Sequence, residues 1–462
     1  MQQTGMSPGE RRATFSLAAI YALRMLGLFL ILPVFALYAD EHLPDSTPTL
    51  IGLAIGVYGL SQAIFQIPLG MLSDRIGRQP VIIGGLLLFA LGCVVAAMAD
   101  TIVGVIIGRI LQGSGAIAAA VMALAADHTR EEHRTKAMAV IGMTIGVSFA
   151  FALVAGPLLN GWIGVPGIFW LTAVFALAGI AVLKLGVPQK VESHFHCDTE
   201  AMPTKFMTVL RDTELLRLNF GIMSLHAMLM ASFVALPFAL RDHAGLAVDH
   251  HWQIYLPVML LALALMVPFI LAAETKRRMK EVFVGAIVVL GLSELVLALF
   301  YDSVAGIAVA LLLFFISFNV LEATLPSLIS KTAPVDGKGT AMGIYSTSQF
   351  LGAFVGGVLG GWIYGNQGLA GVFVLCAVLA GLWAAVAYGM ASPRYVKSYL
   401  LKVGLLDDNQ SRALAERIRQ VPGVAEAVVA DGTAYLKVDA LLLDEPALLA
   451  FSADAQGRAS VA

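Results

Sequence analysis

Ionisable side chains lie inside long apolar stretches of this chain, where they could bind protons or charged groups. A charge at the centre of a bilayer costs roughly 2.5–3.5 kcal/mol on insertion scales, so it is usually functional or paired. Glu322 is the first candidate proton carrier, because protonation would break an ion pair with Arg24 or Arg109 and bias two conformations. His226 is the second candidate. A static ion pair or hydrogen bond between helices is the alternative for each of them.

Further polar side chains share helix faces with these charges. Arg109 and Gln112 are three residues apart, and Glu322 lies three residues after Asn319. The predicted substrate path contains Tyr21, Arg24, Gln66, Arg109, Gln112, Asn219, Asn319 and Gln349. For Gln66 and Gln349, a role in joining helices is the alternative. Glu294 falls outside this pattern, and we expect a structural partner or a site near the outer interface.

Other reactive groupings are sparse. The phosphate-binding pattern G-x-x-x-x-G-K-[ST] is absent, since Gly337-Lys338-Gly339 lacks both the preceding glycine and the hydroxyl residue. The three cysteines lie far apart, and the ligand types at 194–197 have no second cluster, so we expect no disulfide framework, metal or cofactor. No covalent catalytic grouping and no basic patch is found. The sequence therefore argues against an enzyme, an ATP-driven pump and a nucleic-acid-binding protein.

The composition indicates that membrane helices position these residues. Apolar residues make up 59% of the chain and charged residues 13%, compared with about 45–50% and 25% in soluble domains. The first apolar stretch is longer than a signal-peptide core, so we expect it to be retained. With about 20 residues needed per span, the twelve predicted spans cover residues 13–38, 49–69, 80–99, 102–126, 136–158, 167–187, 218–240, 252–273, 281–300, 303–327, 338–364 and 369–391.

Lysine and arginine placement predicts the orientation. One alternating set of connections, with the N-terminal segment, is rich in these residues, whereas the opposite set holds only Arg241. Positively charged connections stay in the cytoplasm, so we expect both termini and the 188–217 segment there. The rich set contains Arg11, Arg12, Arg75, Arg78, Arg130, Arg134, Lys136, Lys184, Lys190, Lys205, Arg211, Arg217, Lys276, Arg277, Arg278, Lys280, Lys331 and Lys338.

The chain also repeats at an offset of about 200 residues. Gly161-Trp162-Ile163 recurs as Gly361-Trp362-Ile363, and Asp74 with Arg78 recurs as Glu274 with Arg278. These matches fall at the ends of corresponding helices. They predict two parallel six-span repeats, which normally place a substrate site between them.

Three motifs carry a family resemblance. The stretch Gly70-Met71-Leu72-Ser73-Asp74-Arg75-Ile76-Gly77-Arg78-Gln79 resembles the G-x-L-a-D-r-x-G-r-k signature of the major facilitator superfamily, with Gln79 replacing the usual base. Arg109, Gln112, Gly113 and Gly115 resemble that superfamily's R-x-x-q-G-x-G pattern. Gly156, Pro157 and Gly161 resemble the helix 5 motif of its drug:proton antiporters, although Ala152 and Asn160 replace glycines.

The resemblance extends over nearly the whole chain, to a bacterial inner-membrane transporter with a C-terminal ferredoxin-like domain. It implies that spans 1, 4, 7 and 10 line a central path. It also implies a conformational lock, in which Asp74 approaches Gly339 at the start of span 11; a simple topology-setting turn is the alternative. The residues of this lock are Gly70, Asp74, Arg75, Gly77, Arg78 and Gly339. A packed kink is the alternative to an antiporter role for Gly156-Pro157.

After Pro393 the pattern changes to that of a small soluble domain. We predict a strand at 395–403, a helix at 408–420 capped by aspartate, a hairpin of 424–430 with 433–438, and a short helix at 444–451. The order resembles a ferredoxin-like domain. It lacks the C-x-x-C of related metal carriers, so regulation, ligand sensing or self-association are its candidate roles.

Together these features predict an all-α membrane protein with twelve helices in two halves and a small α+β C-terminal domain. The predicted parts are 1–187, 188–217 (connection), 218–391 and 395–462. We expect a multi-pass protein of the bacterial inner membrane, with a small-molecule substrate and protons as partners. Proton-coupled efflux of a drug-like molecule by alternating access is the preferred function. A proton-independent facilitator or importer, and a transporter-like sensor that signals through the tail, are the alternatives.

Overall fold

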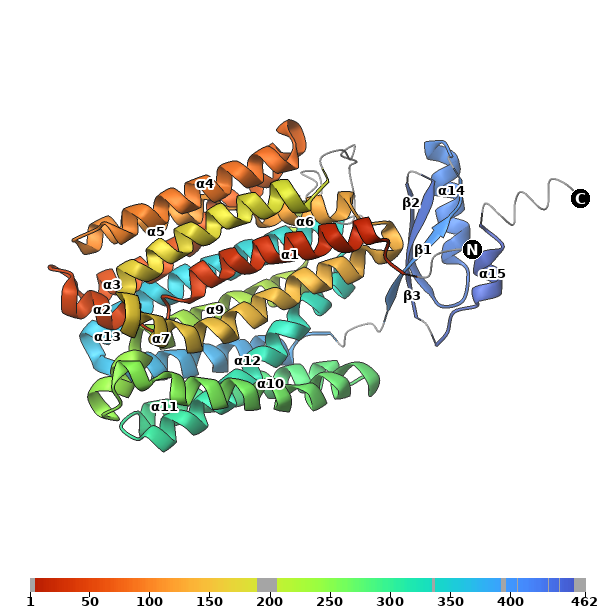
Figure 1. Cartoon of the computed structure of the whole chain (residues 1–462). Helices are drawn as coiled ribbons and strands as arrows, with labels where there is room; N and C mark the ends of the chain where they lie inside the picture. Colours follow the sequence, from red (N-terminus) through yellow and green to blue (C-terminus); the bar gives the residue numbers. More distant parts are fainter. Residues whose placement is uncertain are drawn as a thin grey trace, which may run out of the picture.

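The computed structural model consists of a long helical bundle with a small α+β domain at one end (Figure 1). It describes residues 5–188, 206–334, 337–391, 396–404, 406–430, 432–439 and 441–452. His194, His196 and Cys197 lie outside these ranges. We call the end of the bundle next to the small domain the domain end, and the opposite end the far end.

The bundle is built from helices that match the predicted apolar stretches. Its elements are α1 (Pro8–Phe29), α2 (Phe35–His42), α3 (Pro48–Ile76), α4 (Arg78–Ala97), α5 (Ile102–Ser114), α6 (Ala118–Asp127), α7 (Glu131–Gly186), α8 (Phe206–Arg211), α9 (Thr213–Phe238), a π-helical turn (Ala239–His243), a 3-10 turn (Val248–His250), α10 (Trp252–Thr275), α11 (Met279–Phe300), α12 (Val304–Thr332) and α13 (Lys338–Tyr388).

The twelve predicted spans are present in the described residues. Ten helical segments there are long and apolar enough to cross a bilayer. Two of them, α7 and α13, are broken inside at Gly164 (φ 66°) and Gly368 (φ 74°), a backbone region that glycine adopts at little cost. Each therefore contains two spans. The breaks fall at matching positions of the two halves, as the repeat of about 200 residues requires.

Two spans are less regular than their apolar patterns suggest. The first ends at Phe29 and continues as α2 after a turn that contains Pro33, which has no backbone N–H to donate. The fourth is split into α5 and α6 around Gly115. A Cβ atom on Gly115 would lie 2.3 Å from the Gly85 carbonyl oxygen, so close contact with α4 requires glycine there.

Glycines also bring equivalent helices together in each half. A Cβ on Gly156 would lie 2.5 Å from the Leu30 oxygen, and one on Gly356 would lie 2.1 Å from the Ala227 oxygen. At the helix 5 motif, α7 remains helical through Pro157. The helix is interrupted seven residues later, at Gly164. Gly156 therefore acts through close packing on the first span.

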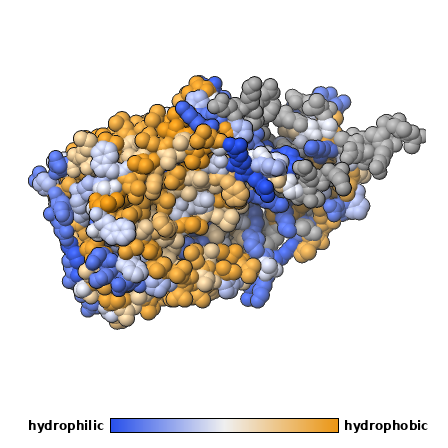
Figure 2. Space-filling model, in the orientation of Figure 1, coloured by the Kyte–Doolittle hydropathy of each residue, from blue (hydrophilic) through white to orange (hydrophobic). Residues whose placement is uncertain are grey.

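The outer surface of the bundle is apolar. Figure 2 shows a broad hydrophobic surface over the helices, with hydrophilic residues gathered at the far end and beside the small domain. Trp162 is 81% exposed on this surface. Large exposed apolar patches mark interaction surfaces, and twelve apolar spans identify this one as the lipid-facing surface.

The small domain follows the predicted order. Strands β1 (Lys397–Lys402), β2 (Val424–Ala430) and β3 (Thr433–Val438) form an antiparallel sheet in the order β1-β3-β2, with α14 (Asp408–Arg419) and α15 (Glu445–Leu449). Asp407 caps α14 in a capping box with Gln410. This arrangement is consistent with the predicted ferredoxin-like fold.

Candidate functional site

The N-terminal half buries a polar cluster around Arg24 of α1. Arg24 is 1% exposed and donates from Nη2 to Oε1 of Gln62 on α3, whose amide lies 3.4 Å from Gln66. Its guanidinium carbon lies 5.9 Å from the ring centroids of both Tyr58 and Phe89. Favourable electrostatic contact with aromatic faces stabilises a cation in such a place.

Arg109 of α5 forms the second part of this cluster. It donates to Gln112 Oε1 at 2.7 Å and to the backbone oxygens of Ala54 and Ile55 on α3 at 3.3 Å. Its guanidinium carbon lies 4.9 Å from the Tyr58 ring centroid. Arg109 and Gln112 share one helix face, as predicted, and are hydrogen-bonded there. The guanidinium groups of Arg24 and Arg109 both lie within 5.9 Å of the Tyr58 ring centroid.

The C-terminal half holds a separate cluster of three polar side chains from three helices. The Gln349 amide nitrogen on α13 lies 3.2 Å from Glu322 Oε1 on α12 and 2.8 Å from His226 Nε2 on α9. His226 Nδ1 lies 3.3 Å from the Ile222 oxygen, and its Nε2 is 3.9 Å from Glu322 Oε2. The structure thus brings together the two predicted proton carriers and one predicted path residue.

Among the described residues, the hydrogen bonds and ion pairs of each cluster stay within its own half in this conformation. Within the described residues, Glu322 pairs with His226 and Gln349, and neither Arg24 nor Arg109 forms an ion pair with it. Pairing of Glu322 with an arginine stays a prediction for another conformation.

Aromatic side chains fill the interface between the halves. Phe149 of α7 lies 5.9 Å from Phe315 and 6.0 Å from Phe318 of α12, by ring centroids. Phe149 also meets Phe29 of α1 at 5.0 Å, and Phe318 meets His226 at 5.8 Å. The Glu322 cluster therefore borders an aromatic contact between the two halves.

The remaining predicted path residues have different surroundings. Tyr21 is buried one turn from Arg24, and Asn319 donates to the Phe315 oxygen of its own helix at 2.7 Å. Asn219 is buried, with neither amide atom bonded among the described groups. Glu294, which we expected outside the path, accepts a hydrogen bond from Ser232 at 2.8 Å and is fully buried.

At the far end the two halves are in direct contact through α3 and α13. A Cβ on Gly52 would lie 2.1 Å from the Gly357 oxygen, and one on Gly59 would lie 2.5 Å from the Phe350 oxygen. Nearby, Arg241 forms ion pairs with Asp40 and Glu41 across the halves. The far end is therefore closed between these helices.

At the domain end, Asp74 and Arg78 of the predicted lock form a cluster with other residues of the N-terminal half. Arg78 pairs with Asp74, lies 3.5 Å from Asp127 Oδ2 and donates to Ser73 at 3.0 Å. Gly77 (φ 99°) makes the turn between α3 and α4 that brings Arg78 back over Asp74. Asp74 pairs here with Arg78, so its predicted approach to Gly339 stays a prediction for another conformation.

The other lock residues and the repeat partner have distinct positions. Arg75 is exposed, and a Cβ on Gly70 would lie 3.1 Å from Ala119. In the C-terminal half, Glu274 pairs with Lys331 of α12 at 3.0 Å, while Arg278 faces Glu281 at 3.9 Å. The Asp74 and Glu274 positions therefore both hold ion pairs, with different partners.

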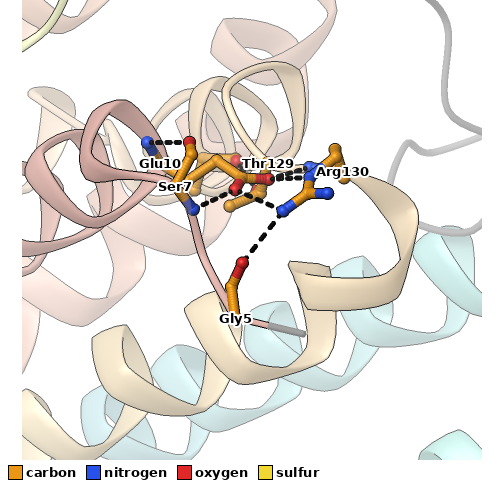
Figure 3. A network of polar contacts seen from close by, with 6 residues as sticks. Gly5, Ser7, Glu10, Thr129 and Arg130 are labelled. Carbon is orange, nitrogen blue, oxygen red and sulfur yellow. Dashed lines mark hydrogen bonds and ion pairs between the residues drawn. The ribbon is translucent and has the colours of Figure 1, made fainter. Parts of the chain in front are cut away.

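A further polar network fixes the start of α1, as Figure 3 shows. Arg130, at the start of α7, donates to Glu10 from its backbone N–H (2.9 Å) and its side chain (3.0 and 3.1 Å), and to the Gly5 oxygen at 3.1 Å. Ser7 and Glu10 form a capping box. Both partners belong to one half, so this network stiffens the half and does not join the two.

Sequence reasoning missed several residues of these clusters. Tyr58 is an aromatic residue inside the apolar stretch 49–69, where aromatic side chains are common, so nothing in the sequence distinguished it. Asp127 could have been found, because it is the acidic residue that directly follows the predicted span 102–126, just before Arg130 and Arg134. The contacts of Phe149 with α12 depend on tertiary packing alone.

These features are those of a polytopic membrane protein built from two six-helix halves. The model of the Major Facilitator Superfamily matches residues 17–356 and 276–401, and the chain belongs to this family of transporters; it is not an enzyme. It is 48% identical to the inner membrane transport protein YajR of Escherichia coli strain K12, over 95% of this chain and 96% of that protein.

Two further similarities are more distant. The tetracycline resistance protein of class H from Pasteurella multocida is 34% identical over 31% of this chain and 36% of that protein. A solved bacterial homologue of the human lysosomal transporter Spinster, in an inward-facing and occupied conformation, has a TM-score of 0.69 at 13% identity and covers 83% of this chain and 97% of that one. The similarity to the Spinster homologue supports the assignment of the fold alone. Together with the apolar helices, the YajR similarity supports a multi-pass protein of the bacterial inner membrane.

Proposed function

We propose that this protein exports a small, drug-like molecule in exchange for protons by alternating access. The observation that supports this most is the cluster of Glu322, Gln349 and His226 at the interface of the halves. Ionisable groups inside a membrane protein mark proton and ion pathways. A carboxylate that has no cationic arginine partner in this conformation, beside an aromatic contact between the halves, suits a group that changes charge during the cycle.

The hydrogen bonds are compatible with a neutral His226. Gln349 offers two N–H donors, one for Glu322 and one for the free ring nitrogen of His226, while Nδ1–H donates to Ile222. Protonation of Glu322 neutralises the carboxylate that accepts the hydrogen bond from Gln349. It therefore weakens the bond between α12 and α13. The proton therefore acts on α9, α12 and α13 of the C-terminal half at once. Its effect reaches the other half through Phe318, which contacts both His226 and Phe149 of α7.

The contacts at the two ends support the conformational part of the proposal. With both termini in the cytoplasm, as the positive charges indicate, the closed far end is periplasmic. Substrate would then enter from the cytoplasm. In the opposite state α3 separates from α13 at the far end, and Asp74 closes on the start of α13 at the domain end.

The test is substrate-evoked proton movement in proteoliposomes. The panel contains tetracycline, lipophilic cations, weak acids and sugars, and the variants are Glu322→Gln and, as a matched control, Glu294→Gln. We expect a pH response that Glu322→Gln abolishes and Glu294→Gln retains, because Glu294 lies outside the path. Substrate flux without proton movement in the wild type would instead identify a facilitator or importer.

The small domain supports a regulatory role as a second candidate. Lys437 of β3 donates to the Lys331 and Ala333 oxygens at the end of α12, and Arg277 binds Asp439 at 3.0 Å. Such contacts could report the position of α12 to the cytoplasm. Deletion of 395–462 tests this: unchanged transport and oligomeric state would exclude regulation and self-association, and ligand binding without flux in the full chain would favour a sensor.

A further inference from the structure

The buried charges of the two halves have opposite signs. Away from the span ends, the spans of the N-terminal half contain Arg24 and Arg109, and those of the C-terminal half contain Glu294 and Glu322. Two buried cations without a carboxylate are unfavourable in a low-dielectric interior. The central path is therefore positive on one side, where a negative group would be stabilised.

Arg24 has unused donors. One of its nitrogens donates to Gln62, whereas Nε and Nη1 have no hydrogen-bond partner among the described residues, at 1% exposure. Arg109, by contrast, uses three nitrogens on Gln112, Ala54 and Ile55. Nη2 forms one donor edge with Nε and another with Nη1, so a carboxylate that takes the place of Gln62 at Nη2 would meet two donors, which matches carboxylate geometry. Arg24 is thus the arginine of this cluster that is available to a ligand.

Arg24 lies beneath a contact that must open during the cycle. The Tyr58 ring lies over both arginines and meets Phe350 of α13, in the opposite half, at 6.5 Å. The Tyr58 hydroxyl is buried without a partner among the described groups. Separation of α3 from α13 at the far end breaks this contact and opens the Arg24 site toward the far end, the side on which an exported anion would leave.

The interface that Phe29 reaches, five residues after Arg24 on α1, suits an aromatic body, since Phe29 contacts Phe149 at 5.0 Å between ring centroids. Phe149, Phe315 and Phe318 meet between the halves with ring centroids about 6 Å apart. An aromatic ring can replace such contacts with offset or edge-to-face packing.

We propose that the substrate is an aromatic organic anion, whose carboxylate binds Arg24 while its ring lies among the interface phenylalanines. This assignment rests on the proposed transport function for its place in the cycle, but the binding itself does not depend on protons. Gln62 releases Arg24 when the anion binds, and Tyr58 offers its hydroxyl to the second carboxylate oxygen.

The experiment measures binding to the purified full chain in lipid nanodiscs by calorimetry. Three probes share one ring system and differ in charge: 2-naphthoate, 2-naphthylmethanol and 2-naphthylmethylamine. We expect naphthoate to bind about tenfold or more tightly than the alcohol, since hydrogen bonds to charged groups are the stronger class. Arg24→Gln should reduce naphthoate to the affinity of the alcohol, and the alcohol should bind both proteins equally.

Two variants keep the test decisive. Arg24→Lys retains the charge and should keep part of the preference, which shows that loss in Arg24→Gln is not misfolding. Arg412→Gln removes an exposed arginine of the small domain and should change nothing. Equal binding of the three probes, tighter binding of the amine, absence of binding by folded protein, or a preference that survives Arg24→Gln would overturn the anion site. Naphthoate binding without proton movement would leave this site in place and refute only the proton-coupled function.

Discussion

Closure of the far end depends on glycines, and one added methyl group should shift the conformational equilibrium. In Gly52→Ala the new Cβ would lie 2.1 Å from the Gly357 oxygen and 3.0 Å from the Gly361 backbone. These neighbours are helix backbone, which cannot rotate away as a side chain can. Overpacking of this kind costs about 1–3 kcal/mol. Because the open state does not contain the contact, the ratio of closed to open molecules should fall roughly 5- to 150-fold.

Distances between spin labels at the far end measure this shift. Labels on Asp100→Cys and Gln367→Cys, two exposed positions in opposite halves, should report one short distance in the parent and a larger share of long distances with Gly52→Ala. Gly84→Ala is the matched control, because a Cβ there has no neighbour within 4 Å. An unchanged distance distribution in Gly52→Ala, with Gly84→Ala also unchanged, would falsify the reasoning that this glycine contact holds the far end closed.

Three further predictions concern the domain end. Glu10→Gln should lower thermal stability by about 1–2 kcal/mol in detergent melting, because the anchored start of α1 loses its ionic contact with Arg130; an unchanged melting curve would contradict this. Lys437→Met should speed proteolytic release of the small domain, since its 5%-exposed ammonium caps the end of α12, whereas Lys402→Met at an exposed position should not. The backbone N–H of Leu441 and the Arg277 side chain lower the pKa of Asp439 from its ordinary value of 3.8. Its ionised contact should therefore persist as the pH falls through 3.8 and be lost only below that value, while Asp439→Asn should weaken docking even at neutral pH, by the same proteolysis assay.

The sequence was a good guide to what depends on lipid and on local chemistry. Spans follow from apolar length, the break at Gly368 repeats the one at Gly164, and the Asp407 cap with its hairpin follows from local propensity. It was a poorer guide to partners across the interface. The sequence offered Arg24 or Arg109 as a partner of Glu322 but did not indicate Gln349, which donates to it in this conformation. Helical periodicity predicts which face a residue occupies, but the rotation and separation of the two halves decide which faces meet, and these differ between conformations.

The contacts of the small domain limit how it could act on transport. Its described polar contacts with the bundle involve Arg277, Lys331 and Ala333, which all belong to the C-terminal half. Lys331 in turn pairs with Glu274, so the domain, α10 and α12 are linked. A domain that joined both halves by such contacts would oppose their relative movement. One that is linked to a single half can move with it. Its influence would pass through the connected ends of α10 and α12, and α12 is the helix that carries Glu322.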